Sequence, residues 1–179
     1  ELAESSPEGL SDELRGAVTE TLNDLAVGGD HVARSEAIRA LGVWGDARSA
    51  RVLVGILLDN RNRSVSDAVY KALGQLKDPS SAVAVAERLD DFFDRDRAEA
   101  CLRAMGPAAE DALVAVAPTA KRDGCLRALR LLRDCGTEKC LNVLRDAQES
   151  RDPMIRQMGK AAIRSVRLRQ RAEEDDGSE

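Results

Sequence analysis

The apolar positions along the chain follow a helical period, and the same pattern returns at a fixed interval. The phrase "RALGVWGD" at residues 39–46 is followed by "KALGQLKD" at 71–78 and by "RAMGPAAED" at 103–111. Successive glycines of these phrases lie 32 and 32 residues apart, and a weaker fourth copy follows after 30 residues at Gly136. Self-similarity at this period is typical of solenoids, in which each unit offers the same surface to the next.

Each phrase predicts the end of one helix and the start of another. Positions one, four and five residues before the glycine are apolar in every copy, which is the spacing of a buried helix face. The glycine is expected to end this first helix, because it adopts the left-handed conformation without a Cβ penalty. Asp46, Asp78 and Thr137 then stand where a second helix needs an N-cap. The position three residues before the glycine is always cationic and forms an outer row: Arg39, Lys71, Arg103 and Arg133.

Segments on both sides of the repeats predict capping helices. "GLSDELRGAVTETLNDLA" carries apolar residues three or four apart, and Asp152-Pro153 opens a segment rich in Lys and Arg. We predict one repeat domain over residues 9–172, a disordered N-terminal end at 1–8 and a disordered acidic tail at 173–179. No segment alternates as a strand would, so the predicted fold class is all-α.

The segment "VARSEAIRALGVWGDARSARVLVGILLD" resembles the HEAT-like repeat of bacterial proteins, a class also found in phycobilin lyases. The resemblance covers roughly residues 30–150. It implies a right-handed α-solenoid, an armadillo/HEAT-like superhelix of about four to five two-helix repeats, whose second helices line the concave side. The chain departs from the pattern at "GPAAEDALVAVAPTAK", where the turn is short and Pro118 comes late in a second helix. We expect the stacking to bend there.

Composition narrows the possible partners. Only 2% of the 179 residues are aromatic, so Ala, Val, Leu and some Ile must fill the core. The net charge of −5 makes nucleic acid an unlikely partner, because phosphate binding depends on cations. No apolar run approaches the roughly 20 residues that a bilayer demands, so membrane insertion is not expected. The chain begins at Glu1 without a leader-like segment, which favours the cytoplasm, and a periplasmic location stays open if a leader was removed.

No catalytic or metal-binding motif stands out. The chain lacks GxSxG, HExxH and phosphate-loop patterns, and His31, beside Asp30, is its only histidine. The cysteines are spaced 24, 10 and 5 residues apart, which fits no zinc motif. Cys101 and Cys135 fall in the buried stripe, and a disulfide among Cys125, Cys135 and Cys140 stays open as an alternative. "DDFFDRD" lacks the glycine and terminal Glu of a calcium loop. We therefore predict no enzyme, no metal and no cofactor.

Candidate binding residues follow from the repeat register. The outward positions of the second helices are mixed in charge and poor in aromatics, as suits a helix or an extended peptide. Trp44 is expected in the core. Adjacent Phe92 and Phe93 leave two interpretations open: one ring projects as a binding hot spot, or both pack within their loop. The residues predicted to bind a partner on the concave face are Arg51, Leu58, Glu87, Asp90 and Arg145.

These observations predict a non-catalytic scaffold or adaptor that binds a protein or peptide along the concave face. Nucleic-acid or phosphate binding through the cationic outer row and the basic C-terminal helix is one alternative, and an enzyme of the bilin-lyase kind is another. The expected oligomeric state is a monomer.

Overall fold

The computed structural model describes residue 9 and residues 11–176, and these form an array of helices without a strand. Short 3₁₀ turns (η2 to η5) extend several of the helices. The all-α prediction is confirmed. In chain order the helices are α1 (Asp12–Gly28), α2 (His31–Trp44), α3 (Ala47–Leu58), α4 (Ser66–Leu76), α5 (Pro79–Ala86), α6 (Arg95–Met105), α7 (Glu110–Val116), α8 (Arg122–Cys135), α9 (Leu141–Gln148) and α10 (Pro153–Asp176).

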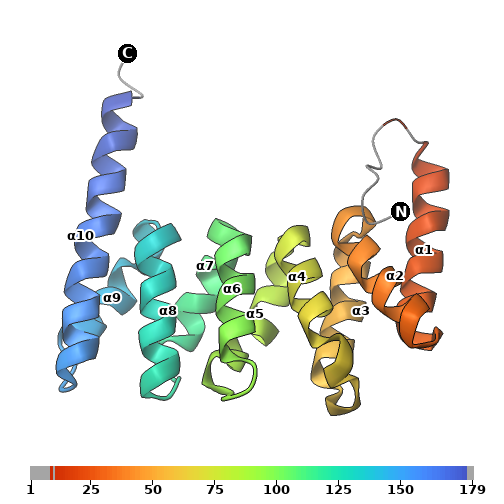
Figure 1. The fold of residues 1–179 in the computed structure, drawn as a ribbon. Coiled ribbons are helices and arrows are strands. Elements are labelled where there is room, and N and C mark those ends of the chain that lie inside the picture. Colours follow the sequence, from red (N-terminus) through yellow and green to blue (C-terminus); the bar gives the residue numbers. More distant parts are fainter. Residues whose placement is uncertain (1–8, 10, 177–179) are drawn as a thin grey trace.

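The helices build two rows of an α-solenoid. The first helices of the repeats (α2, α4, α6 and α8) stand side by side in one row, and the second helices (α3, α5, α7 and α9) lie behind them (Figure 1). Helices α1 and α10 close the two ends of the array. One hydrophobic core runs through the array from Leu22 in α1 to Val166 in α10, and it contains Trp44 as predicted. No helix in residues 11–176 combines the length and the apolar content needed to span a bilayer.

The predicted N-caps of the second helices are confirmed. The Asp46 carboxylate accepts a hydrogen bond from the backbone N–H of Ser49 at 2.9 Å, and the Asp78 carboxylate accepts one from Ser80 at 2.9 Å. Thr137 accepts from the N–H of Lys139 at 3.4 Å. These side chains satisfy amide groups that lack a partner within the helix, so the first, second and fourth repeats have a capped start for their second helices, whereas α7 in the third repeat has no side-chain cap.

The predicted role of the repeat glycines is wrong at two positions. Gly42 and Gly74 lie inside α2 and α4, which continue past them. A Cβ at Gly42 would lie 3.1 Å from the Cα of Ala72, and one at Gly74 would lie 3.1 Å from the Cβ of Ala104. These glycines therefore let successive first helices approach closely, because a side chain would hold them apart. Gly106 and Gly136 do follow the ends of α6 and α8, as predicted. Gly106 has a positive φ of 60°, whereas Gly136 is extended at a φ of −70°, so the predicted left-handed conformation is wrong there.

The C-terminal helix is longer than the predicted domain boundary allows. Helix α10 continues to Asp176, so residues 173–176 of the predicted disordered tail are helical. The predictions for residues 1–8 and 177–179 lie outside the described residues.

Candidate functional site

The row of second helices is interrupted between the third and fourth repeats. Helix α3 packs on α5 and α5 packs on α7, whereas on the side of α9 helix α7 contacts η5 (Glu138–Cys140), the turn before α9, and has no comparable packing on α9 itself. Helix α7 has only 7 residues, and the chain turns away from it at Pro118. The row of first helices continues past this point, because α6 contacts α8 and α8 contacts α10. The interruption lies where Pro118 predicts a bend in the stacking.

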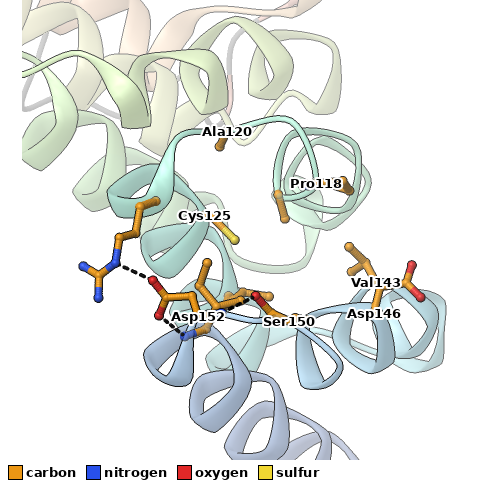
Figure 2. Close-up of a pocket in the computed structure, with 12 residues that line it drawn as sticks. Pro118, Ala120, Cys125, Val143, Asp146, Ser150 and Asp152 are labelled. Atoms are coloured by element: carbon orange, nitrogen blue, oxygen red, sulfur yellow. Dashed lines mark hydrogen bonds and ion pairs between the residues drawn. The ribbon is translucent and has the colours of Figure 1, made fainter.

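A cavity of about 470 Å³ fills the interruption (Figure 2). The connection between α7 and α8, which carries Pro118 and Ala120, forms one side, and α9 with Val143 and Asp146 forms another. Its lining is mostly apolar, with polar groups on α8, on α9 and in the connection between α9 and α10. The lining residues are Ala117, Pro118, Ala120, Arg122, Cys125, Leu129, Val143, Asp146, Ala147, Ser150, Asp152 and Ile155.

The cavity arises from a loss of side-chain volume at one repeat position. Eleven residues after the repeat glycine stand Leu53, Val85, Ala117 and Ala147 in successive repeats. Leu53 and Val85 are fully buried in the stacked part of the array. The two alanines line the cavity instead. This trend is visible in the sequence once the repeats are aligned, and it is the signal by which the cavity could have been found.

A hydrogen-bonded ion pair borders the cavity. The Arg122 Nε donates to the Asp152 Oδ2 at 2.6 Å, and the other carboxylate oxygen accepts from the backbone N–H of Met154 at 2.8 Å and of Ile155 at 3.2 Å. The Arg122 guanidinium, followed by these amides, holds the pKa of Asp152 below its ordinary value. Asp152 thus caps α10 and links it to α8, as the dashed lines in Figure 2 show.

Cys125 contributes a half-buried thiol to the cavity. Burial, together with the carboxylates of Asp152 and Asp90, raises the pKa of this thiol. A thiol with a raised pKa is protonated at neutral pH and is a poor nucleophile. All four cysteines are free, so the disulfide alternative does not occur in the structure. Cys101 is buried as predicted, whereas Cys135 is only half-buried.

Four of the five residues predicted to bind a partner are exposed along the second helices. Arg51, Glu87 and Arg145 are exposed, and the Leu58 side chain is 50% exposed. Val83, which occupies the same repeat position as Arg51, is also exposed, at 47%. None of these residues lines the cavity. They form a surface of mixed charge along the row that contains it.

Asp90 is engaged within the chain. Its two carboxylate oxygens accept hydrogen bonds from the backbone N–H of Lys121 at 3.1 and 2.9 Å. A Cβ at Gly124 would collide with this carboxylate, so the glycine makes room for it. Asp90 therefore joins the second repeat to the start of α8, and its carboxylate is already engaged within the chain.

Phe92 and Phe93 are both exposed, at 71% and 65%. Their rings form an edge-to-face pair with centroids 5.5 Å apart. The Arg95 guanidinium lies 4.8 Å from the centroid of Phe92, and that of Arg63 lies 5.2 Å from the centroid of Phe93. The interpretation that both rings pack within their loop is therefore wrong, and both rings project toward solvent. The pair lies at the edge of the array where each second helix connects to the next first helix.

The cationic outer row is largely neutralised by its own helices. Glu36 pairs with Arg39 at 2.5 Å, Glu99 with Arg103 at 2.8 Å and Asp134 with Arg133 at 2.9 Å. Such exposed pairs add little stability, but they reduce the positive potential of the row. Within the described part of the chain, no group of His, Cys, Asp and Glu side chains has the arrangement of a metal site. His31 is exposed at the start of α2.

The first and second helices of each repeat are antiparallel and form two rows around a shared core. This arrangement defines the molecule as an α-solenoid. Residues 19–106 match the family model for HEAT repeats, and the chain is a HEAT-like repeat protein. No curated protein and no solved structure matches it. The matched segment ends before the cavity, so the interruption lies in the part of the array that departs from the family pattern.

Proposed function

We propose that the protein is a non-catalytic scaffold that binds a peptide segment of another protein along its second helices. The proposed binding surface, called here the second-helix face, consists of the exposed residues Arg51, Leu58, Val83, Glu87 and Arg145 together with the cavity between α7 and α9. The HEAT-like repeats support a scaffold role, because stacked repeats offer an extended surface rather than a single deep site.

The cavity is the observation that carries this proposal. Its volume of about 470 Å³ is within the range of ligand sites, and Pro118, Ala120 and Ile155 give it an apolar floor that solvent still reaches. An apolar side chain of a bound peptide would exclude water from this floor and gain the free energy of burial. Asp146 and the mixed charges along the second helices would contact the polar groups of the same peptide. The ligand that fits best is therefore a peptide with one large apolar anchor residue.

The chemistry of the cavity supports binding rather than catalysis. The Cys125 thiol is kept protonated by its raised pKa, and Arg122 and Asp152 already satisfy each other. The lining contains no aromatic side chain, so it gives no support to a bilin-lyase-like enzyme, which would want aromatic walls for the pigment. Phosphate binding through the outer row loses support for a different reason, because Arg39, Arg103 and Arg133 are paired with acids.

A displayed library of random peptides, selected on the immobilised chain, tests the proposal. Peptides selected on the wild type are expected to share a large apolar residue and to lose most of their binding to Ala147→Leu, which fills the cavity. Ala161→Leu is the matched control, because it adds the same side chain at an exposed position of α10 outside the cavity. Peptides that bind both variants equally well would overturn the proposal.

Thiol protection gives a second readout at the cavity itself. Cys125 lines the cavity and Cys135 does not, and both are half-buried free thiols. A bound peptide is expected to slow alkylation of Cys125 while alkylation of Cys135 proceeds as before. Equal protection of both thiols, or of neither, would place the peptide elsewhere.

A further inference from the structure

The C-terminal helix carries a row of exposed cations on its outward side. Lys160, Arg164, Arg167 and Arg171 are spaced four, three and four residues apart, so they lie on one face of α10. All four are exposed, and none has an ion-pair or hydrogen-bond partner among the described side chains. This row, called here the basic flank, differs from the cationic outer row, whose members are mostly paired with acids of their own helix.

The N-terminal helix carries a row of acids with a matching spacing. Glu13, Glu20 and Asp24 are exposed and lie on the outward face of α1. Among the residues that the structure describes, only Glu20 of these three has a cationic neighbour, Arg48 at 3.6 Å. Glu13 and Asp24 are as far apart in sequence as Lys160 and Arg171. Both rows are therefore about 16 Å long at a rise of 1.5 Å per residue. We call the row on α1 the acidic flank.

Helices α1 and α10, which carry the two flanks, lie at opposite ends of the array (Figure 1). Helix α10 starts at the same edge as the first helices, because it follows α9 as α8 follows α7, whereas α1 runs opposite to α2. A second copy that continued the array would therefore lay its α1 antiparallel on α10. We propose that the chain self-associates head to tail through this contact. The register places Lys160 against Asp24, Arg164 against Glu20 and Arg171 against Glu13 of the next copy.

The inside of the array supports the proposal. Neighbouring first helices are already joined by ion pairs, Arg97 with Asp67 and Arg127 with Glu99. The flanks also carry exposed apolar side chains beside the charged rows, namely Leu168 at 59% and Leu14 at 57%. A contact between the flanks would bury these side chains and pair the charges. Because the two surfaces differ, the contact is heterologous and leads to open chains rather than closed dimers.

Sedimentation equilibrium of the full chain with reciprocal charge reversal tests the proposal. The associated fraction of the wild type is expected to rise with protein concentration. Association should be weaker in about 1 M salt, where the Debye length is about 3 Å, than in about 0.1 M salt, where it is about 10 Å. Arg164→Glu with Arg167→Glu, and separately Glu20→Lys with Asp24→Lys, should each weaken association by about tenfold or more. An equimolar mixture of the two variants should associate again, because each supplies the flank that the other lacks.

Three outcomes would overturn the proposal: a wild type that stays monomeric at low salt, single-flank variants that associate as the wild type does, or a mixture that remains monomeric. Thermal unfolding of each variant checks that it is folded, since all four substitutions are at exposed positions. A monomeric wild type that binds a mixed-sequence DNA duplex through Arg164 and Arg167 would assign the basic flank to phosphates instead. The peptide-binding proposal is unaffected by any of these outcomes, because the cavity lies apart from both flanks.

Discussion

The stacked second helices α3, α5 and α7 and the open junction between α7 and α9 use the same repeat plan with opposite results. In the stacked part Leu53 and Val85 fill the space between neighbouring repeats and are fully buried. At the junction the corresponding residues are Ala117 and Ala147, and a cavity remains. The array holds together there because the first helices stay in contact from α6 to α10. One row can thus maintain the solenoid while the other opens into a binding site.

The two regions are expected to differ most in how much unfolding free energy they lose when a side chain is shortened. Leu53→Ala should lower the free energy of unfolding by about 2–5 kcal/mol, because it leaves a void in a closely packed interior. Val143→Ala should cost only about 1–2 kcal/mol, since Val143 already borders open space and the loss is mainly that of its methyl groups. Urea unfolding followed by circular dichroism measures both. Equal losses would mean that the junction is as tightly packed as the stacked part.

Replacing an alanine by the larger leucine should also destabilise the stacked part more than the junction. Ala50 is fully buried beside Leu53, and Ala50→Leu should destabilise the protein by about 1–3 kcal/mol through overpacking. Ala147→Leu makes the same chemical change where space exists, so its stability should stay within about 1 kcal/mol of the wild type. The same unfolding experiment compares the two variants. A strongly destabilised Ala147→Leu variant would contradict an open cavity in solution.

A smaller effect is expected at the N-cap of α3, in the stacked part of the array. The hydrogen bond from the backbone N–H of Ser49 is the main reason that the pKa of Asp46 lies below its ordinary value of 3.8. The stability from this ionised cap is therefore fully present above about pH 4 and is lost as the pH falls through the lowered folded pKa. Asp46→Ala should cost about 1 kcal/mol at neutral pH, with a smaller difference from the wild type in acid.

Asp46→Asn is the matched control for the cap. The amide oxygen of Asn can accept the same hydrogen bond without titrating, so this variant should keep most of the stability and lose the pH dependence. Chemical unfolding at several pH values between 3 and 7 measures all three proteins. An Asp46→Ala variant whose deficit did not change with pH would show that the carboxylate charge contributes nothing at this cap.

The two-helix repeats were predictable because each is specified by local sequence. The apolar stripe before Gly42 and the caps at Asp46, Asp78 and Thr137 depend on residues a few positions apart, and all are found in the structure. The conformation at Gly42 and Gly74 was not predictable in the same way. These glycines allow close contact between helices about 30 residues apart in sequence. A glycine just before a turn predicts a helix end when only the sequence of its own helix is considered.

The candidate site was only partly predictable for a similar reason. Pro118 marked the place where the stacking departs from the repeat, but the cavity also depends on alanines at one repeat position and on the neighbouring α10. Asp90 was predicted as a partner-binding surface residue, because nothing near it in sequence reveals its hydrogen bonds to Lys121 at the start of α8. Exposure of Phe92 and Phe93 likewise depends on how their loop sits on the array.

The smallest expected effect concerns the ion pair at the open junction. Arg122→Gln should leave the unfolding midpoint almost unchanged, because Arg122 and Asp152 are both solvated and exposed pairs contribute little. The pKa of Asp152 should nevertheless rise toward its ordinary value, since the Arg122 hydrogen bond is the main cause of its depression. It should remain below that value, because the amides of Met154 and Ile155 still donate to the carboxylate.

Carboxyl NMR titration of Asp152 measures this change, and Arg164→Gln, on the outward face of α10, is the control that should not alter it. The result bears directly on how the junction is held together. If packing between α8 and α10 maintains the array beside the cavity, removal of the ion pair changes a titration and little else. A large fall in the unfolding midpoint of Arg122→Gln would instead mean that a single charge contact holds α10 in place, and the continuous row of first helices would no longer explain why the second row can open.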